Sequence, residues 1–390
     1  MKRALVFYLY SANNAGDMAI CLGTIAYLKS KGFRITMVSR FDALAPEYAA
    51  SRSFVQSYYP DVVVEPGVFR LNRGEGKVSL AMQYASGALK CALPGDDKRI
   101  VDLVNNCDVV FFNGGNLLRC ASLTDRARLQ ALFYPIKIAG KRGKPCICLP
   151  QSTATIGTSW IRYLGKELSV FDKIYIREAA SFEKLRALYP DVSFVLCTDM
   201  AFFMDDLCAR ESAQNSDGRV AIVVRGTGIG DIGTLAKARR EEMQGAVVDL
   251  VKSNLDRRYL ITVQTQKDRE LSAAYYRELT ALGVNVELVE EHDPFKLLKI
   301  YRGCDLTLSM RLHACILSVR AGTPVIGFFD PSWGLKNQGV MEDYRMGCVF
   351  DSFQLEDEFL KVASNRDRLS GSSYTRILEH RAELDEFFKD

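Results

Sequence analysis

Several features that would point to particular classes of protein are missing from this sequence of 390 residues. No apolar run approaches the roughly 18 residues of a membrane-spanning helix, so the sequence does not predict an integral membrane protein. Basic residues exceed acidic residues by only four, 51 against 47, and so small an excess gives no reason to expect nucleic acid as a partner. It leaves room for a mildly basic surface that faces an anionic substrate or lipid headgroups.

The sequence also lacks the cysteine spacing of a zinc site or a disulfide framework. Its 11 cysteines are odd in number, scattered and never spaced Cys-x-x-Cys. We therefore expect no metal site, and reduced thiols in a cytoplasmic protein. Residues 1–10 combine basic charge with a short apolar run, but no small-residue cleavage pattern follows, so they predict a β-strand rather than a signal peptide.

Short apolar runs alternate with helix-length segments along the whole chain. Nearly continuous apolar runs are typical of strands covered on both faces, and this alternation predicts parallel sheets with right-handed crossovers. We therefore predict an α/β fold with two Rossmann-like domains facing a cleft. The expected strands are Ala4–Tyr10, Arg34–Ser39, Asp108–Phe112, Cys146–Leu149, Lys173–Ile176, Phe194–Leu196, Val220–Val224, Tyr259–Val263, Asn285–Val289, Leu306–Leu308 and Val325–Phe329.

A polar, turn-rich stretch interrupts the alternation near the middle of the chain. It spans Leu207–Gly218 and predicts a linker between domains. The expected division is an N-terminal Rossmann-like domain over 1–207, a C-terminal one over 218–354, and a charged helical tail over 355–390 that packs back on the first domain. In open sheets of this kind ligands bind beyond the carboxyl ends of the strands, so the residues that follow each strand are the candidates for a site.

Small and polar residues follow several expected strands in the N-terminal half. After the first strand, Asn14, Gly16 and Asp17 open a helix whose free amide groups suit an anion or sugar hydroxyls. The alternative is an ordinary turn with Asp17 as the helix cap. No Gly-x-Gly-x-x-Gly follows this strand, which argues against a dinucleotide site there. The other candidates of this half are Asn113, Gly114, Gly115, Gln151, Ser152, Arg177 and Glu178.

In this group the paired glycines, Gly114 and Gly115, allow the close approach of either a ligand or another backbone segment. In the C-terminal half, Arg225 and Gly226 follow a strand, and a planar guanidinium beside backbone amides suits a carboxylate or a phosphate. The alternative is an arginine exposed in a flexible loop. Lys336 follows the last expected strand, and it either brings a further positive charge to the same cleft or is solvated.

The sharpest pattern is Ser309-Met310-Arg311-Leu312-His313, which links a strand to a helix. Ser309 predicts a helix cap, and Arg311 and His313 then lie in the first helical turn, where the helix dipole favours anions. Two residues apart on a regular helix, they diverge by about 200°. They can therefore converge on one ligand only at the frayed end of the helix.

His313 is also the candidate for proton transfer near neutral pH. The sequence holds only three histidines, and the other two lie in less suggestive places. His292 belongs to an acidic loop and His380 to a charged terminal helix, whereas His313 follows a strand and stands beside an arginine. A histidine packed in the core is the alternative.

Taken together, these motifs resemble the polysaccharide pyruvyl transferase family. They occur in the family's order over roughly residues 3 to 347, and the Arg-Leu-His block with the following Gly-x-Pro strand is the most specific part. Pro331, Ser332 and Trp333 depart from the simpler aromatic-Asp-x-Lys run of the family. The matching segments are Asn14–Asp17, Gly114-Gly115, Pro150–Ser152, Arg177-Glu178, Ser181, Asp199, Arg225, Ser309–Ala314, Gly322–Ile326 and Lys336.

The resemblance implies a fold similar to the glycosyltransferase type B architecture. It implies transfer of a pyruvyl group from phosphoenolpyruvate to two hydroxyls of one sugar as a cyclic ketal, with no cofactor. The acceptor would be a sugar of a surface or capsular polysaccharide precursor, and a lipid-linked acceptor would bring the enzyme to the inner face of the cell membrane. The catalytic residues would be His313 and Arg311, the donor-binding residues Arg225, Gly226, Arg311, Leu312, His313 and Lys336, and the acceptor-binding residues Asn14, Gly16, Asp17, Asn113, Gly114, Gly115, Gln151 and Ser152.

Two other functions remain open at the level of the sequence. A nucleotide-sugar-dependent glycosyltransferase would have the same architecture, and the loop at Gly226 with an arginine at a helix end would also suit a diphosphate. A non-catalytic sugar-binding relative would bind the same ligands without releasing phosphate.

Overall fold

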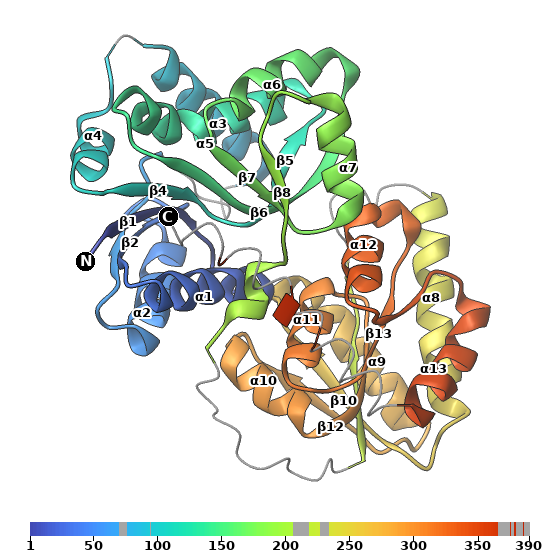
Figure 1. Cartoon of the computed structure of the whole chain (residues 1–390). Helices are drawn as coiled ribbons and strands as arrows, with labels where there is room; N and C mark the ends of the chain where they lie inside the picture. Colours follow the sequence, from blue (N-terminus) through green and yellow to red (C-terminus); the bar gives the residue numbers. More distant parts are fainter. Residues whose placement is uncertain are drawn as a thin grey trace. The chain divides into compact units, whose positions relative to one another are not determined.

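The structure is a computed structural model that describes residues 1–69, 76–93, 95–205, 218–226 and 234–365, together with Thr375, Leu378, Glu379 and Asp385 (Figure 1). The chain divides into two compact units. The first comprises Met1–Ala12, Ile20–Asp205 and Glu383–Asp390, and the second comprises Asn13–Ala19 and Asp206–Ala382. The predicted linker falls almost wholly on 206–217, outside the described residues.

The described part of the first unit contains an eight-stranded sheet in the order β3-β2-β1-β4-β6-β7-β8, with β5 paired to β6. All of its strand pairs are parallel. The interior strands are apolar and buried because helices cover both faces of such a sheet. The strands are β1 (Arg3–Leu9), β2 (Arg34–Ser39), β3 (Val63–Glu65), β4 (Val109–Phe112), β5 (Gly115–Cys120), β6 (Cys146–Ile156), β7 (Lys173–Ile176) and β8 (Phe194–Leu196).

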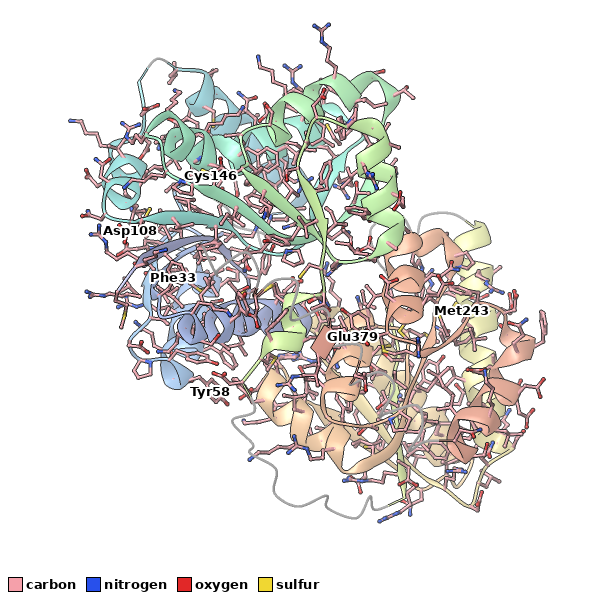
Figure 2. All side chains as sticks on the ribbon, in the orientation of Figure 1. Phe33, Tyr58, Asp108, Cys146, Met243 and Glu379 are labelled. Atoms are coloured by element: carbon pink, nitrogen blue, oxygen red, sulfur yellow. The ribbon has the colours of Figure 1, made fainter. Side chains whose placement is uncertain are left out.

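Short polar residues set the start of several helices in this unit. Asp97 caps α4 by accepting a hydrogen bond from the amide of Ile100, and Ser122 caps α5 by accepting one from Asp125. Phe33 and Cys146, labelled in Figure 2, belong to the buried core. The helices are α1 (Ala15–Ser30), α2 (Pro46–Tyr58), α3 (Gly76–Ala92), α4 (Lys98–Asn105), α5 (Leu123–Lys141), α6 (Ile161–Leu168) and α7 (Ala179–Leu188), with short 3₁₀ turns η2 (Thr158–Trp160) and η3 (Met200–Phe203).

The described part of the second unit contains a six-stranded parallel sheet in the order β11-β10-β9-β12-β13-β14. This is the Rossmann order. Successive strands are added to one side of the first strand and then, from the fourth strand on, to its other side, so the strand order reverses between β9 and β12. The strands are β9 (Arg219–Val223), β10 (Arg258–Val263), β11 (Val286–Glu290), β12 (Cys304–Ser309), β13 (Val325–Phe328) and β14 (Gly347–Val349). The helices are α8 (Thr234–Lys252), α9 (Arg269–Ala281), α10 (Pro294–Arg302), α11 (Leu312–Arg320), α12 (Leu335–Asp343) and α13 (Leu355–Ser364), with 3₁₀ turns η4 (Gln266–Asp268), η5 (Pro331–Trp333) and η6 (Ser352–Gln354).

The fold is α/β, with two parallel sheets and interleaved helices, as the sequence predicted. Each expected strand is present, although β6 continues to Ile156, well past the expected Leu149. The sequence analysis missed β3, β5 and β14.

The segment predicted as a C-terminal tail begins within the second unit. Phe359 and Val362 of α13 belong to the hydrophobic core of this unit, next to residues of α8 and β14. Farther along, Asp385 belongs to the first unit, where it accepts a hydrogen bond from the hydroxyl of Tyr27 at 3.2 Å and pairs with Lys31 at 2.5 Å.

Candidate functional site

The residues that follow β9 and β12 meet at the point where the sheet of the second unit reverses its strand order. Ser309 lies opposite Val223 in the parallel ladder, and the amide of Met310 donates to the carbonyl of Val223 at 2.8 Å. Arg225 and Arg311 each lie two residues past the end of one of these strands. Ligands of doubly wound sheets bind outside the carboxyl ends of the strands at such a reversal, so this position defines the candidate site.

The buried carboxylate of Asp268 joins three strand ends at this site. Asp268 lies after β10 and is 1 % exposed. Its Oδ2 accepts a hydrogen bond from Nε of Arg311 at 2.8 Å, and its Oδ1 accepts one from Nη2 of the same guanidinium. Oδ1 also accepts a hydrogen bond from the amide of Gly226 at 2.8 Å. The bidentate ion pair fixes the plane of the Arg311 guanidinium and uses only one of its edges.

Gly226 has no room for a side chain at this junction. A Cβ built there would lie 2.6 Å from the carbonyl oxygen of Lys267. The glycine therefore lets the backbone after β9 approach the turn after β10 closely enough for its amide to reach Asp268. Residues 227–233, which follow it, lie outside the described residues.

The structure corrects the expected start of the helix at Arg311. The helix α11 begins at Leu312, and Arg311 is its N-cap residue with an extended backbone, φ −122° and ψ 119°. Ser309 does not cap the helix: its hydroxyl accepts from the amide of Arg311 and donates to the carbonyl of Arg311, both at 2.9 Å. Because Arg311 precedes the helix, the expected divergence of about 200° from His313 does not apply.

The ring of His313 lies against the backbone of Gly16. A Cβ on Gly16 would be 2.6 Å from Nδ1 and 2.7 Å from Cγ of His313. Gly16 belongs to the segment Asn13–Ala19, which is part of the second unit. This segment is anchored after β10, because Asn14 forms an antiparallel bridge with Thr265 and the amide of Ala15 donates to the carbonyl of Gln264 at 3.1 Å.

The start of α1 is capped by Asn14 rather than by Asp17. The side-chain oxygen of Asn14 accepts hydrogen bonds from the amides of Gly16 at 3.1 Å and Asp17 at 3.5 Å. The prediction that Asp17 caps the helix is therefore wrong. Asp17 instead lies half-buried in the first turn of α1. Of the predicted acceptor-binding residues, Asn14, Gly16 and Asp17 thus belong to the segment that packs beside His313.

Arg225 stacks on the indole ring of Trp333. Its Cζ atom lies 3.9 Å from the ring centroid, which is close for a cation–π contact. Trp333 is part of η5 and packs against the hydrophobic core of the second unit. The sequence analysis noted Trp333 only as a departure from the family pattern, and the structure gives it a contact with a predicted donor-binding residue. Lys336 lies half-buried in the first turn of α12.

The remaining acceptor candidates are buried polar residues of the first unit. Asn113 is fully buried; its Oδ1 accepts from Thr24 at 2.8 Å, and its Nδ2 donates to the carbonyl of Tyr8 at 3.0 Å. Gln151, also fully buried, donates to the carbonyl of Asn113 at 2.6 Å and accepts from the amide of Leu117 at 3.1 Å. These bonds connect the end of β4 to β1, α1, β5 and β6, so both side chains have a structural role in this conformation.

The paired glycines approach protein rather than open space. A Cβ on Gly114 would lie 2.8 Å from the carbonyl oxygen of Pro150, and one on Gly115, whose φ is 139°, would lie 3.0 Å from the hydroxyl of Tyr10. Tyr10 also donates from this hydroxyl to the carbonyl of Gly114 at 2.6 Å. Of the two alternatives for these glycines, the structure shows the close approach of another part of the chain.

A buried ionic network contains Ser152 and several of the family's motif residues. Nη1 of Arg177 lies 2.5 Å from Asp199, and its Nε donates to the hydroxyl of Ser152 at 2.6 Å. Ser152 in turn donates to Glu178 at 2.7 Å. Ser181 donates to the other oxygen of the Glu178 carboxylate. All of these side chains are less than 5 % exposed, so the network ties β6, β7 and α7 together inside the first unit.

In the portion of the chain that the structure describes, none of the helices combines the length and the apolar character needed to cross a bilayer. Across the same ranges, no three His, Cys, Asp or Glu side chains gather closely enough to hold a metal ion.

Comparison with solved structures defines the class of the fold. The chain is similar to a UDP-GlcNAc 2-epimerase from Neisseria meningitidis bound to UDP-GlcNAc, with a TM-score of 0.61, 11% identity and 100% of both chains covered. It is also similar to a trehalose-6-phosphate synthase, with a TM-score of 0.62, 10% identity, and 100% of this chain and 98% of that chain covered. A third similar structure is a glycosyltransferase from Rickettsia africae, with a TM-score of 0.57, 11% identity, and 100% of this chain and 98% of that chain covered. The architecture is therefore that of the two-domain, Rossmann-like glycosyltransferases of type B and related epimerases.

The model of one family, polysaccharide pyruvyl transferase, matches residues 14–329. The chain belongs to the polysaccharide pyruvyl transferase family, as its motifs predicted. The matched residues begin at Asn14 and include Arg225, Arg311 and His313, and they end before Trp333 and Lys336. No protein with a curated description matches the sequence.

Proposed function

We propose that the protein transfers a pyruvyl group from phosphoenolpyruvate to two hydroxyls of one sugar. Protonation of the methylene carbon of phosphoenolpyruvate gives a cation at C2, which a sugar hydroxyl attacks. Inorganic phosphate departs, the second hydroxyl attacks C2 to close the cyclic ketal, and the departing phosphate takes up the proton of that hydroxyl. The carbons keep their overall oxidation state, so the reaction calls for no redox cofactor.

The arrangement around Asp268 is the observation that best supports this proposal. Phosphoenolpyruvate carries a carboxylate and a phosphate, and both groups need fixed positive charge. Arg311 is oriented by a buried carboxylate and its side chain is 27 % exposed, so the free edge of its guanidinium is available to an anion. A group that is positioned in advance stabilises the departing phosphate without having to reorganise.

In the proposed mechanism His313 moves the protons. It gives one proton to the methylene carbon, and it accepts a proton from an attacking hydroxyl. Arg225, which lies over the ring of Trp333, supplies the second cation of the donor site. Leu312 and the backbone of Gly226 complete its walls, and Lys336 remains a candidate from the first turn of α12.

We propose that the sugar approaches along the segment Asn14–Asp17. Gly16 leaves space for a backbone contact with the His313 ring, and Asp17 is half-buried next to it. We further propose that the acceptor is a precursor of a surface or capsular polysaccharide, and that the reaction takes place in the cytoplasm. A lipid-linked acceptor would bring the enzyme to the inner face of the membrane.

Phosphate release and acceptor mass together test this function. The protein is incubated with phosphoenolpyruvate and candidate glycans, and we expect one inorganic phosphate released for each pyruvyl ketal gained by the glycan. His313→Gln should lower turnover by about 10²–10⁴-fold and change the affinity for phosphoenolpyruvate less. A folded His313→Gln protein with normal turnover would remove this residue from the mechanism.

The type B architecture also favours a second candidate, a nucleotide-sugar-dependent glycosyltransferase. The two functions separate in a thermal-shift comparison of phosphoenolpyruvate with UDP- and GDP-sugars. Stabilisation by a nucleotide sugar, with no effect of phosphoenolpyruvate, would support the second candidate and contradict the first. Binding of glycans without release of phosphate would instead indicate a non-catalytic sugar-binding protein.

A further inference from the structure

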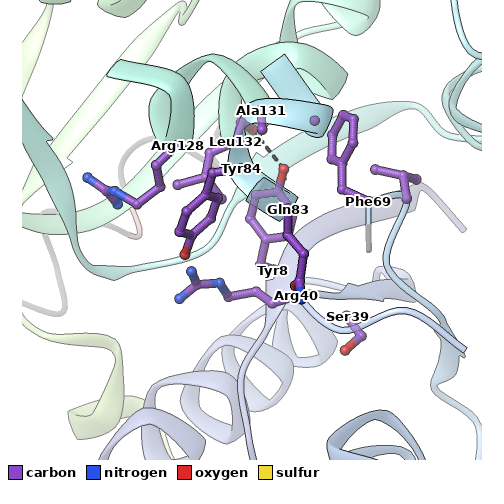
Figure 3. A pocket seen from close by; sticks show the side chains of 11 residues that line it. Tyr8, Ser39, Arg40, Phe69, Gln83, Tyr84, Arg128, Ala131 and Leu132 are labelled. Carbon is purple, nitrogen blue, oxygen red and sulfur yellow. Dashed lines mark hydrogen bonds between the residues drawn. The ribbon is translucent and has the colours of Figure 1, made fainter. Parts of the chain in front are cut away.

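A pocket with a positive lining lies wholly inside the first unit, whereas Arg225, Arg311 and His313 belong to the second unit (Figure 3). It is bounded by the carboxyl end of β2, the residues after β3, and the helices α3 and α5. Its most informative lining residues are Tyr8, Arg40, Phe69, Tyr84 and Arg128.

The charges around this pocket do not balance. Arg119 binds Asp125 through Nε and Nη2, both at 2.8 Å, whereas Nε of Arg128 is 3.8 Å from the same carboxylate. Within the part of the chain that the structure describes, no carboxylate pairs with Arg40. Arg119 and Arg128 therefore share one carboxylate and Arg40 has none, which leaves an excess of two positive charges among these four described side chains.

The two arginines that line the pocket are also incompletely hydrogen-bonded. Arg128 is 9 % exposed, and its Nη2 donates to the carbonyls of Leu117 at 3.0 Å and Arg119 at 2.8 Å. Its Nε is buried without a hydrogen-bond partner among the described residues, and the same holds for Nε of Arg40. A buried cationic donor without an acceptor costs free energy, and an anion in the pocket would remove that cost.

Arg40, Tyr84 and Arg128 are close enough to influence one another electrostatically. Burial lowers the pKa of the Arg128 guanidinium to about 10, and the positive charge of Arg40 contributes to this decrease. The hydroxyl of Tyr84 raises the same pKa. Figure 3 shows the guanidinium groups of Arg40 and Arg128 extending to the same side of the pocket, with the hydroxyl of Tyr84 between them in this view. The rings of Phe69 and Tyr8 provide an apolar wall.

We propose that this pocket binds an anionic group of the acceptor glycan, a carboxylate or a phosphate, through Arg40 and Arg128. The assignment to the acceptor rests on the proposed function, in which residues of the second unit hold the donor. Both kinds of anion suit a planar guanidinium, and the sugar ring that carries the anion would contact the aromatic wall.

Direct binding of anions to the full chain tests the pocket without any assumption about catalysis. The probes are glucuronate for the carboxylate, glucose 1-phosphate for the phosphate and glucose as the neutral control, titrated by calorimetry. All titrations use Arg311→Ala protein, so that anions bound at the donor site do not obscure the result. We expect glucuronate or glucose 1-phosphate to bind and glucose not to bind, and the preferred probe identifies the source of the charge.

Arg40 is the residue to change, because Arg128 also holds two backbone carbonyls that the fold needs. Arg40→Gln should weaken binding of the preferred anion by about 10- to 100-fold, the loss of one charge-assisted hydrogen bond. Arg40→Lys should recover part of the loss. The matched control is Arg52→Gln, which changes an exposed arginine of α2 and should bind the anion as the parent protein does.

Equal binding by Arg40→Gln and the parent protein, or no binding of either anion by the parent protein, overturns the proposal. In the otherwise unchanged enzyme, Arg40→Gln should raise the KM for the acceptor and leave the KM for phosphoenolpyruvate unchanged. A change confined to phosphoenolpyruvate would contradict the assignment to the acceptor. If anion binding depends on Arg40 but phosphoenolpyruvate releases no phosphate, the proposed reaction fails and the assignment to its acceptor fails with it, while the anion site itself is established.

Discussion

Replacing Gly16 with alanine tests whether the position of His313 controls turnover. The added Cβ would lie 2.6 Å from Nδ1, 2.7 Å from Cγ and 2.8 Å from Cβ of His313. Carbon atoms in contact are normally about 3.5–4.0 Å apart, so the ring and the start of α1 must separate by about 1 Å. A misplacement of this size in a catalytic group can lower turnover by about 10²-fold. We expect a loss of that order in the steady-state rate of phosphate release.

The stability of this variant should change much less than its activity. Alanine in place of glycine in a helix favours the helix by about 0.5–1 kcal/mol, which offsets part of the cost of the displaced contact. The matched control is Gly245→Ala in α8, where an added Cβ meets no atom within 4 Å. This control should raise the melting temperature slightly and leave phosphate release unchanged.

A double-mutant cycle shows whether the effect passes through His313. In a His313→Ala protein, Gly16→Ala should cause little further loss of turnover, because the group that it displaces is gone. Full turnover of Gly16→Ala in the otherwise unchanged enzyme would refute the reasoning. So would an equal loss in both backgrounds, since that would indicate a general disturbance of the segment Asn13–Ala19.

Three further substitutions test separate contacts. Arg311→Ala should weaken binding of phosphoenolpyruvate by about 10- to 100-fold, as measured by calorimetry, because one charge-assisted hydrogen bond is lost; unchanged affinity would remove Arg311 from the donor site. Trp333→Leu removes the surface on which Arg225 stacks, a contact worth about 0.5–2 kcal/mol, and should weaken donor binding by about 2- to 30-fold without unfolding the protein. Asp199→Asn breaks a buried ion pair and should lower the free energy of unfolding by about 3–5 kcal/mol in urea titrations, whereas Asp108→Asn, at a solvent-exposed ion pair, should lower it much less.

The sequence predicts the fold well because strands covered on both faces leave a clear apolar signal. The strand Gly115–Cys120 was missed because its start, Asn113-Gly114-Gly115, has the composition of a turn and its residues Asn116 and Arg119 are polar. Pairing with β6 supplies the hydrogen bonds that make this segment a strand, and no local pattern reveals such a partner.

The sequence is less informative about the site, because roles there depend on residues far apart in the chain. It identified Arg311 and His313 but placed Arg311 inside the helix, because serine is a common N-cap residue and Ser309 therefore suggested an earlier helix start. It gave no signal for Asp268, which is 43 residues from Arg311 and holds its guanidinium. Asn113 and Gln151 follow expected strands as ligand-binding residues do, and only their buried partners show that they connect β4, β5 and β6.

The stacking of Arg225 on Trp333 also gives the protein a built-in optical reporter. The chain has only two tryptophans, and the other, Trp160, lies in the first unit within 5.7 Å of the Arg126 guanidinium. Trp160→Phe would therefore leave a single indole emitter, whose neighbouring cation belongs to the proposed donor site. A ligand that draws Arg225 toward its own charge would change the quenching and the emission wavelength of that indole. Donor occupancy could then be followed by fluorescence on the millisecond scale, without labels and before any ketal forms.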